Sequence, residues 1–318
     1  MGSPLTGKRI LVTGSSGVIG RELLTLLANT DAEILSVDRS PLPTVLGERV
    51  QHLQRDIVAD PLEALGRFRP HCFFHLAAAF ERSKESPAFW NTNWQDNVVL
   101  SHRLLEAVKA CDELAVLVFA SSYLVYSPAQ YLFPDARPHA VRLPEQGTVT
   151  PRNLCGAAKY YTEQEIDFVR AYFRPSLRTV HARIFRVYGR GSRDVISRWV
   201  RAGLDGQPIE MYNSQNRFDF IFARDVAEGL MKLAECPQAK GAVNIGTGSS
   251  RSIHEMAALL SEQLPVIRSL IRDTGQREDI EASCADTTNL AALTGWTPPT
   301  TLEKGLGALV EFERQPRL

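Results

Sequence analysis

The 318-residue sequence has few of the features that mark secreted, metal-binding or membrane proteins. Its five cysteines are dispersed, and none of them forms a CxxC pair or a spacing typical of metal ligands. An odd and scattered set predicts reduced thiols in a cytoplasmic protein, with no disulfide framework and no metal site. No apolar run approaches the length of a membrane span, and the N-terminus has no signal-peptide core.

The sequence also lacks an excess of charge of either sign. Lys and Arg together number 36, as do Asp and Glu, so the formal net charge at pH 7 is zero. This balance gives no indication of nucleic acid or an anionic membrane as a partner. The hydrophobic share of 44% and the charged share of 23% are those of an ordinary globular protein. At this length we expect a domain joined to a smaller lobe.

The most informative stretch is KRILVTGSSGVIGRELLTLL at residues 8–27. It begins with an apolar run that predicts a buried strand, and it ends with leucines at the spacing of a helix. Between these two segments lie Gly14, Gly17 and Gly20. A strand, a glycine turn and a helix are typical of a pyrophosphate site. Glycine lets the backbone approach the ligand, and the helix N-terminus offers unpaired N–H groups.

A second apolar run, residues 33–37, ends at Asp38. Asp38 lies roughly 20 residues beyond the glycines, where the ribose-binding acid of a dinucleotide fold occurs. A carboxylate there binds the ribose 2′-hydroxyl and repels a 2′-phosphate. Asp38 therefore favours NAD, while the adjacent Arg39 leaves NADP possible.

Further motifs follow along the chain. HLAA at 75–78 ends an apolar run that predicts a strand, and Asn97 begins a segment with leucines at helical spacing. Another apolar run, residues 115–120, leads into SSYLVY at 121–126. A hydroxyl at the carboxyl end of a parallel strand faces the ligand crevice. Ser122 is therefore a candidate for contacting the substrate oxygen that exchanges a proton.

Together with TGSSGVIG, these motifs resemble the extended subgroup of the short-chain dehydrogenase/reductase superfamily, which contains NAD-dependent nucleotide-sugar epimerases and dehydratases. RFDFIFARDV at 217–226, NIGTG at 244–248 and LTGWTP at 293–298 fit the same family in the expected order. The resemblance implies an α/β fold, with a Rossmann-type doubly wound parallel sheet and a smaller C-terminal substrate lobe. It assigns residues 1–180 and about 215–248 to the NAD-binding domain, and about 181–214 and 249–318 to the lobe.

The resemblance also implies which residues bind the two ligands. The implied NAD contacts are Gly14, Ser16, Gly17, Val18, Ile19, Gly20, Asp38, Arg39, Asp56, Ile57, Leu76, Ala77, Ala78, Asn97, Ser121, Lys159 and Phe185. The implied contacts to a nucleoside-diphosphate sugar are Ser122, Tyr123, Arg186, Arg217 and Arg277. Arg186 stands where the family has Asn, and a guanidinium there can bind an anion through two hydrogen bonds.

The catalytic helix departs from the family at one position. The family has YGxxK, in which the lysine charge lowers the phenol pKa, but here Cys155 precedes Lys159 by one helical turn. A free thiol titrates near 8.5 against about 10 for a phenol, and we expect Lys159 to lower the pKa of Cys155 further. The thiol is also much shorter than a phenol ring, so it would not reach the same substrate hydroxyl unless the substrate lay deeper or a water molecule bridged the two.

Three interpretations of this departure stay open. In the first, another residue acts as the base in place of the family's tyrosine, either Cys155 itself or one of the tyrosines at 123, 126, 160 and 161. Alternatively, the protein binds NAD and a sugar nucleotide with little turnover, or the cysteine is an introduced substitution.

The pattern favours an epimerase over a dehydratase or decarboxylase. Those enzymes of the family carry a carboxylate just after the catalytic Ser or Thr, where this chain has Tyr123 and Leu124. We therefore predict an NAD-dependent nucleotide-sugar epimerase that forms a transient keto-sugar, with Ser122, Cys155 and Lys159 as catalytic candidates. A binder without turnover and an NAD(P)H-dependent carbonyl reductase are the alternatives. The helices near Asn97 and Lys159 resemble the dimer-forming pair of relatives, so a homodimer is expected.

Overall fold

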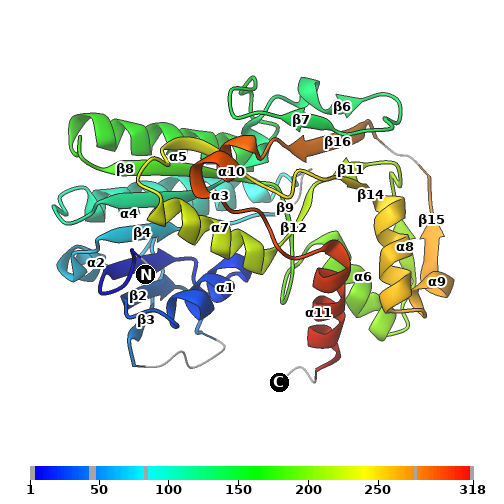
Figure 1. Cartoon of the computed structure of the whole chain (residues 1–318), viewed down its shortest axis with the longest axis horizontal. Helices are drawn as coiled ribbons and strands as arrows, with labels where there is room; N and C mark the ends of the chain where they lie inside the picture. The colour runs from blue at the N-terminus through cyan, green and yellow to red at the C-terminus, as the bar shows by residue number, and fades with distance from the viewer. Residues whose placement is uncertain (1–3, 43–47, 82–84, 276–277, 316–318) are drawn as a thin grey trace.

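The computed structural model describes residues 4–42, 48–81, 85–275 and 278–315. One predicted substrate ligand, Arg277, lies outside these residues. Figure 1 shows a large sheet flanked by helices, and beside it a smaller part built of short strands and helices, mostly from the C-terminal half of the chain.

Seven strands form the large sheet in the order β13-β8-β5-β4-β1-β2-β3, and every neighbouring pair is parallel. The strands are β1 (Arg9–Thr13), β2 (Glu33–Asp38), β3 (Val50–Gln54), β4 (Cys72–His75), β5 (Val116–Ser122), β8 (Arg178–Ile184) and β13 (Gly241–Ile245). The chain starts in the middle of the sheet and adds strands outward in both directions, as in a doubly wound fold. The predicted fold class is therefore confirmed.

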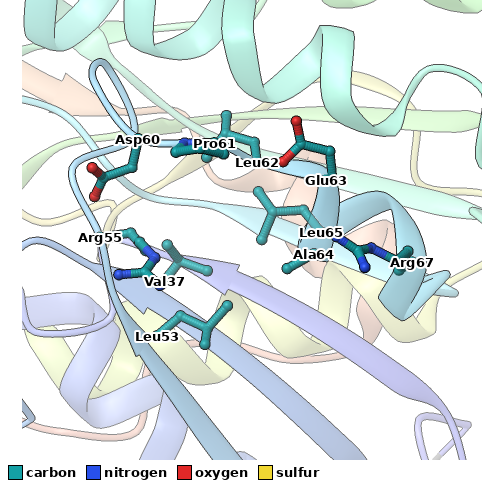
Figure 2. Close-up of a pocket in the computed structure, with 10 residues that line it drawn as sticks. All are labelled: Val37, Leu53, Arg55, Asp60, Pro61, Leu62, Glu63, Ala64, Leu65 and Arg67. Carbon is teal, nitrogen blue, oxygen red and sulfur yellow. The ribbon is translucent and has the colours of Figure 1, made fainter.

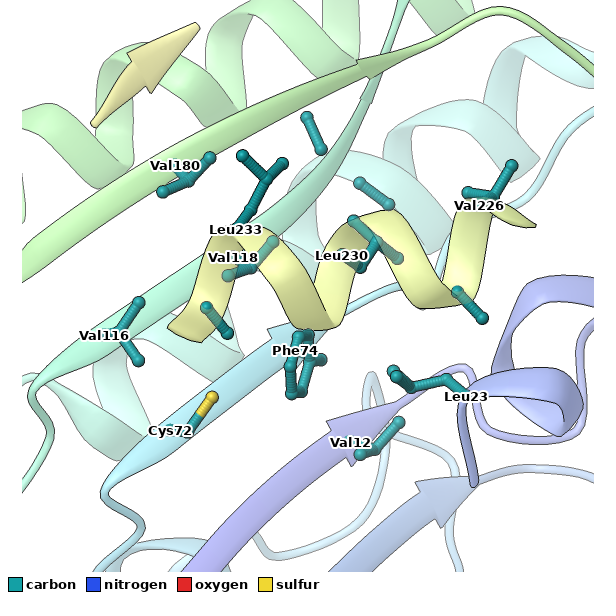
Figure 3. Close-up of a cluster of buried hydrophobic side chains, with 14 of the residues drawn as sticks. Val12, Leu23, Cys72, Phe74, Val116, Val118, Val180, Val226, Leu230 and Leu233 are labelled. Carbon is teal, nitrogen blue, oxygen red and sulfur yellow. The ribbon is translucent and has the colours of Figure 1, made fainter. Parts of the chain in front are cut away.

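Helices cover both faces of this sheet because its central strands are apolar on both sides. One face carries α1 (Val18–Leu27) and α7 (Ala223–Glu235), and the other carries α2 (Glu63–Phe68), α4 (Leu100–Val108) and α5 (Leu154–Tyr172). Figure 3 shows Leu230 and Leu233 of α7 above Phe74 and Val118 of the sheet. This packing holds the carboxyl ends of the strands in fixed positions.

The smaller part contains short sheets and four helices. Its strands are β6 (Leu132–Phe133), β7 (Val141–Leu143), β9 (Arg186–Tyr188), β10 (Ile209–Met211), β11 (Arg217–Phe218), β12 (Phe220–Phe222), β14 (Arg251–Ser252), β15 (Ile271–Asp273) and β16 (Ile280–Ala285). Its helices are α6 (Val195–Leu204), α8 (Ile253–Gln263), α9 (Ile267–Leu270) and α11 (Leu302–Arg314). Trp199, Phe220, Met256 and Leu306 belong to its own buried apolar cluster.

The remaining elements are short helices. They are α3 (Phe89–Asn93), a π-helix (Trp94–Val99), two 3₁₀ helices (Tyr123–Val125 and Pro128–Gln130) and α10 (Thr288–Thr294). The strands β6 and β7 come from the first half of the chain but pair with β16 near its end. The predicted division into two domains stays a prediction. Among the described residues, no helix is long and apolar enough to span a membrane, and no group of side chains has the make-up of a metal site.

Candidate functional site

The predicted cofactor residues gather where β1 and β4 end, at the point where the strand order of the sheet reverses. Gly14 has φ +72°, and a Cβ atom there would lie 2.5 Å from the backbone nitrogen of Ala77. A Cβ on Gly20 would lie 2.2 Å from the carbonyl oxygen of Gly14. Only glycine fits these two positions, because any side chain would push the turn away from β4 and from α1. The turn is thus pressed against the HLAA segment in the crevice where doubly wound sheets bind ligands.

The N-terminus of α1 faces this turn without a capping side chain. Gly17 is the N-cap residue, and it has no side chain that could accept from the N–H groups of the first turn. The predicted contacts Val18 and Ile19 are the first two residues of the helix. Backbone N–H groups at such an end favour the negative charge of a pyrophosphate.

Asp38 ties the glycine turn to the end of β2. One of its carboxylate oxygens accepts from the backbone N–H of Ser16 at 3.0 Å, and the other accepts from that of Ser40 at 2.9 Å. The neighbouring Arg39 forms an ion pair with Asp96 at 3.1 Å. The carboxylate of Asp38 is therefore fixed beside the glycine turn, and its role at the ribose stays a prediction.

A cavity of about 400 Å³ lies beside these residues rather than among them (Figure 2). Its walls come from the ends of β2 and β3 and from α2, and they include Val37, Leu53 and Leu65. Neither Asp38 nor Asp56 lines it. Successive side chains of a strand point to opposite faces, so Val37 and Asp38 face different sides of the sheet. The cavity belongs to the α2 face of the sheet.

The loop after β4 is held by the predicted residue Asn97, which lies in the π-helix. Its side-chain oxygen accepts from the N–H of Ala79 at 2.7 Å, and its amide nitrogen donates to the carbonyl of Ala79 at 3.0 Å. This pair of hydrogen bonds fixes the backbone that follows the predicted contacts Leu76, Ala77 and Ala78. The other predicted pair, Asp56 and Ile57, follows β3, where Asp56 accepts from the N–H of Val58 at 2.9 Å.

Ser121 and Ser122 end β5 and serve different partners. The hydroxyl of Ser121 donates to Glu163 of α5 at 2.5 Å, and Glu163 pairs with Arg183 at 2.8 Å in a buried ion pair. The hydroxyl of Ser122 accepts from the N–H of Leu124 at 3.2 Å, as the N-cap of a 3₁₀ helix. Ser122 is partly exposed, whereas Ser121 is buried.

Helix α5 carries the two remaining catalytic candidates against the end of β5. A Cβ on Gly156 would lie 2.4 Å from the carbonyl oxygen of Leu124, so this glycine permits the close contact. The carboxylate of Glu85 accepts from the N–H groups of Leu154 and Cys155, each at 2.8 Å, and stabilises the helix N-terminus. Sequence reasoning missed Glu85, because its loop is far from α5 along the chain and carries no capping motif.

Cys155 does not have the lowered pKa that we expected from its neighbour. The residue is 3% exposed, and burial raises the pKa of its thiol to about 11, although the charge of Lys159 opposes this. The expectation that Lys159 would lower the thiol pKa below its ordinary value is therefore wrong. Desolvation of the thiolate outweighs the attraction of one nearby ammonium group.

Lys159 responds to burial in the opposite direction. Burial lowers the pKa of its amine to about 8, while Cys155 and Glu163 oppose the shift. Its Nζ atom lies 4.7 Å from the centre of the Phe119 ring. Lys159 is thus a buried amine that changes its charge close to neutral pH.

The four tyrosines that are candidates for a substitute base differ in burial and in hydrogen bonding. Tyr123 donates to Glu281 at 3.0 Å and Tyr126 donates to Asn244 at 2.7 Å, and burial raises the pKa of both phenols. Tyr160 is half-buried and Tyr161 is exposed. The first two hydroxyls are therefore engaged in structural hydrogen bonds, and their raised pKa values keep them protonated near neutral pH, so they are poor proton acceptors.

Glu281 of β16 connects several of the predicted substrate residues. One carboxylate oxygen accepts from Tyr123 and from Ser283, each at 3.0 Å. The other accepts from Arg152 and, at 3.2 Å, from Arg186. Burial by itself would raise the pKa of Glu281, but the two guanidinium groups outweigh it and hold the pKa below its ordinary value. Sequence reasoning found Tyr123 and Arg186 but missed Glu281 and Arg152, since neither lies in a motif.

Two aromatic rings flank the Arg186 guanidinium. Its central carbon lies 4.0 Å from the ring centre of Phe218 and 5.8 Å from that of Tyr123. The Tyr123 ring in turn stacks on the predicted cofactor residue Phe185, with ring centres 5.1 Å apart. Arg217, on β11, forms an ion pair with Glu255 at 3.2 Å. The structure thus brings Tyr123, Phe185 and Arg186 together and gives Arg217 a different carboxylate partner.

Several known proteins are similar to this chain in sequence. The sequence model of the NAD dependent epimerase/dehydratase family matches residues 10–246. The chain is 25% identical to dTDP-L-rhamnose 4-epimerase from Burkholderia thailandensis, over 96% of this chain and 95% of that protein. It is also 25% identical to GDP-6-deoxy-D-mannose reductase from Pseudomonas aeruginosa, over 95% of this chain and 96% of that protein.

One solved structure is similar in both fold and sequence. MoeE5 in complex with UDP-glucose and NAD has a TM-score of 0.83 and 29% sequence identity, over 96% of this chain and 99% of that chain. MoeE5 has also been solved in complex with UDP-glucuronic acid and NAD, with the same similarity to this chain.

Proposed function

The chain belongs to the NAD-dependent epimerase/dehydratase family, and we propose that it is a nucleotide-sugar epimerase. It is an enzyme whose cofactor is NAD. The described residues fit NAD, because Gly14 leaves room beside Ala77 and Gly17 leaves the helix end uncapped. The observation that carries the proposal is the meeting of this turn, Ser122 and Lys159 at the carboxyl edge of one sheet.

We assign the chemistry to the chain's own groups as follows. NAD, when bound, supplies the acceptor for a hydride from a sugar carbon. The hydroxyl of Ser122 orients the sugar hydroxyl on that carbon. The neutral amine of Lys159 accepts the hydroxyl proton as the keto-sugar forms, and it returns that proton when the hydride comes back to the other face. Epimerisation thus leaves the overall count of protons and electrons unchanged.

Lys159 is the best supported proton acceptor among the candidates. With a pKa of about 8, its amine is partly neutral under mildly alkaline conditions, whereas the Cys155 thiol is protonated. A general base works best when its pKa lies near the working pH. Cys155 then fills the place of the usual tyrosine without taking up the proton itself.

Binding without turnover is the second candidate. It is favoured by Cys155 itself, because a buried thiol stands at the family's catalytic position in place of a phenol. A carbonyl reductase is the third candidate, supported by the similarity to GDP-6-deoxy-D-mannose reductase. A reductase would consume one NAD(P)H for each product, whereas an epimerase returns its cofactor to the starting state.

Turnover of a sugar-nucleotide panel tests the proposal. The NAD-loaded protein is incubated with UDP-, dTDP-, GDP- and CDP-sugars, while absorbance at 340 nm and product stereochemistry are followed. We expect one sugar to be epimerised, and we expect Cys155→Ala to retain turnover within about threefold, since the thiol is not the base. Turnover only after Cys155→Tyr would favour the binding protein, and net oxidation of NADH would favour the reductase.

We further propose that the protein is a cytoplasmic homodimer. All five cysteines are free and buried, as befits a reducing compartment. Exposed aromatic side chains lie on α3, the π-helix and α5, namely Trp90, Trp94, Tyr161, Phe168 and Tyr172. Clustered exposed aromatics are typical of a protein interface. A molar mass in solution equal to that of one chain would contradict the dimer.

A further inference from the structure

The buried amine of Lys159 has no carboxylate partner of its own. The residue is 8% exposed, and among the described residues no acid lies within ion-pair distance of its Nζ atom. Glu163, one turn further along α5, accepts instead from Arg183 at 2.8 Å and from Ser121 at 2.5 Å. Because desolvation disfavours the charged form of a buried amine, the ammonium group needs another stabilising contact.

The ring of Phe119 supplies such a contact. The Nζ atom of Lys159 lies over this ring, 4.7 Å from its centre, and Phe119 is 1% exposed on β5. The face of a phenyl ring carries partial negative charge and attracts a cation within about 6 Å, most strongly where water is excluded. Since both groups are buried, the contact favours the charged form of the amine.

His75 lies beside the same ring but carries no charge. It is the register partner of Phe119 on β4, and the two ring centres are 5.1 Å apart. Its ring nitrogens lie 3.1 Å from the Thr13 hydroxyl and 3.0 Å from the Ser101 hydroxyl. Burial, and then the charge of Lys159, lower the pKa of His75 to about 3. The imidazole is therefore neutral near pH 7 and does not compete with Lys159 for the ring.

The other charged groups near α5 have partners elsewhere. On the helix itself, Cys155 and Glu163 raise the pKa of Lys159, but less than burial lowers it. Glu85 accepts from the backbone at the start of the helix. On the elements packed against α5, the pairs are Arg183 with Glu163, His181 with Asp167, Asp96 with Arg39, His102 with Glu165, and Tyr123 with Glu281. These engagements leave the Phe119 ring as the direct partner of the ammonium group.

We propose that Phe119 is a positioning residue of the proposed epimerase, because its ring holds the ammonium group of Lys159 and strengthens its hold on the proton. This inference rests on the proposed function and adds what sets the working pH of the base. Lys159 is the group that meets the substrate, and Phe119 acts through it. Without the ring, burial would move the amine further toward its neutral form, and the site would work at lower pH.

An NMR titration of the Lys159 amine in the NAD-loaded full chain tests the proposal. Lysine is labelled with ¹³C, and the signal is assigned from its loss in Lys159→Arg. We expect Phe119→Leu to lower the midpoint of the titration by about half a pH unit to one unit, since a buried cation–ring contact is lost. The midpoint of the pH profile of kcat should fall by the same amount.

Phe73→Leu is the matched control. Phe73 is a buried phenylalanine two residues before His75 on β4, and it stacks on the same imidazole with ring centres 5.7 Å apart. We expect it to lose as much stability to urea as Phe119→Leu and to keep the wild-type titration of Lys159. A merely structural role of Phe119 would give the two variants the same titration.

A second variant keeps the shape of the ring. Trifluorophenylalanine placed at position 119 alone withdraws electron density from the ring face, so it should also lower the midpoint, even if Phe119→Leu fails to fold. An unchanged or raised midpoint in this protein overturns the proposal, as does an equal fall in Phe73→Leu. Absence of turnover with every sugar nucleotide overturns the epimerase proposal alone, because the amine titration needs no substrate.

Discussion

The proposed cofactor side and the proposed substrate side of the crevice are built in different ways. On the cofactor side, Gly14, Gly17 and Asp38 act through backbone shape and short hydrogen bonds between neighbouring loops. On the substrate side, Arg186 and Glu281 act through long side chains from segments far apart in the sequence. The first kind of site tolerates almost no change, whereas the second can be rebuilt by exchanging side chains. This difference lets one fold keep its cofactor while its substrate changes.

The largest effect on turnover is expected at Lys159, which lies between the two sides. Lys159→Arg keeps the positive charge but cannot release a proton near neutral pH. We expect turnover to fall by about 10²- to 10⁴-fold, the usual contribution of a general base, with NAD still bound. Steady-state rates and the NAD content of the purified variant check this. Near wild-type turnover in Lys159→Arg would contradict the assignment of Lys159 as base.

The next effect concerns the carboxylate that holds the substrate side together. Glu281→Ala leaves two arginines in a buried site without their acid, which we expect to destabilise the fold by about 3–5 kcal/mol. Glu255→Ala is the control, since Glu255 is a more exposed acid paired with one arginine, and we expect it to cost about 1 kcal/mol. Urea unfolding measures both. Equal losses of unfolding free energy in the two variants would show that Glu281 has no special role in holding the two arginines.

A smaller effect isolates the contact on the cofactor side. Gly14 and Gly7 have similar φ angles, +72° and +69°, but a Cβ meets backbone only at Gly14. Gly7→Ala should cost about 1–2 kcal/mol from backbone strain alone. Gly14→Ala should cost a further 1–3 kcal/mol from the steric clash and should abolish NAD binding. Retained NAD binding in Gly14→Ala would contradict the claim that the cofactor side tolerates almost no change.

The smallest effect is a pH dependence. Because the pKa of Lys159 is lowered to about 8 and the neutral amine is the active form, kcat should rise with pH until about 8 and then level off. Below pH 8 we expect a tenfold loss per pH unit. The pH profile of kcat with saturating substrate checks this. A rate that falls as pH rises through 8 would show that the protonated amine is needed instead.

The sequence was sufficient for the fold and for the position of the glycine turn within it. The glycine turn, the buried strand runs and Asp38 are local patterns, and local patterns fix backbone geometry. The structure places Asp38 within hydrogen-bond distance of Ser16, at the end of β2. These features follow from chain segments that are short and contiguous.

The substrate side was only partly accessible from sequence. Glu281 and Glu85 each make their hydrogen bonds to residues far away in the chain, and no local pattern marks either position. The thiol pKa of Cys155 was misjudged for a related reason, because burial depends on how distant segments pack around it. Sequence identifies which groups are present, but the packing of distant segments decides their charge.

The most direct test of the account is the reaction run in D₂O, with product analysed by NMR and mass spectrometry. Transient oxidation returns the same hydride to the sugar carbon, so the account predicts an epimerised sugar nucleotide with no deuterium on carbon and no net change in NAD. A product that carries solvent deuterium on carbon would mean that a C–H proton had exchanged with water. That result would contradict an epimerase that works by hydride transfer.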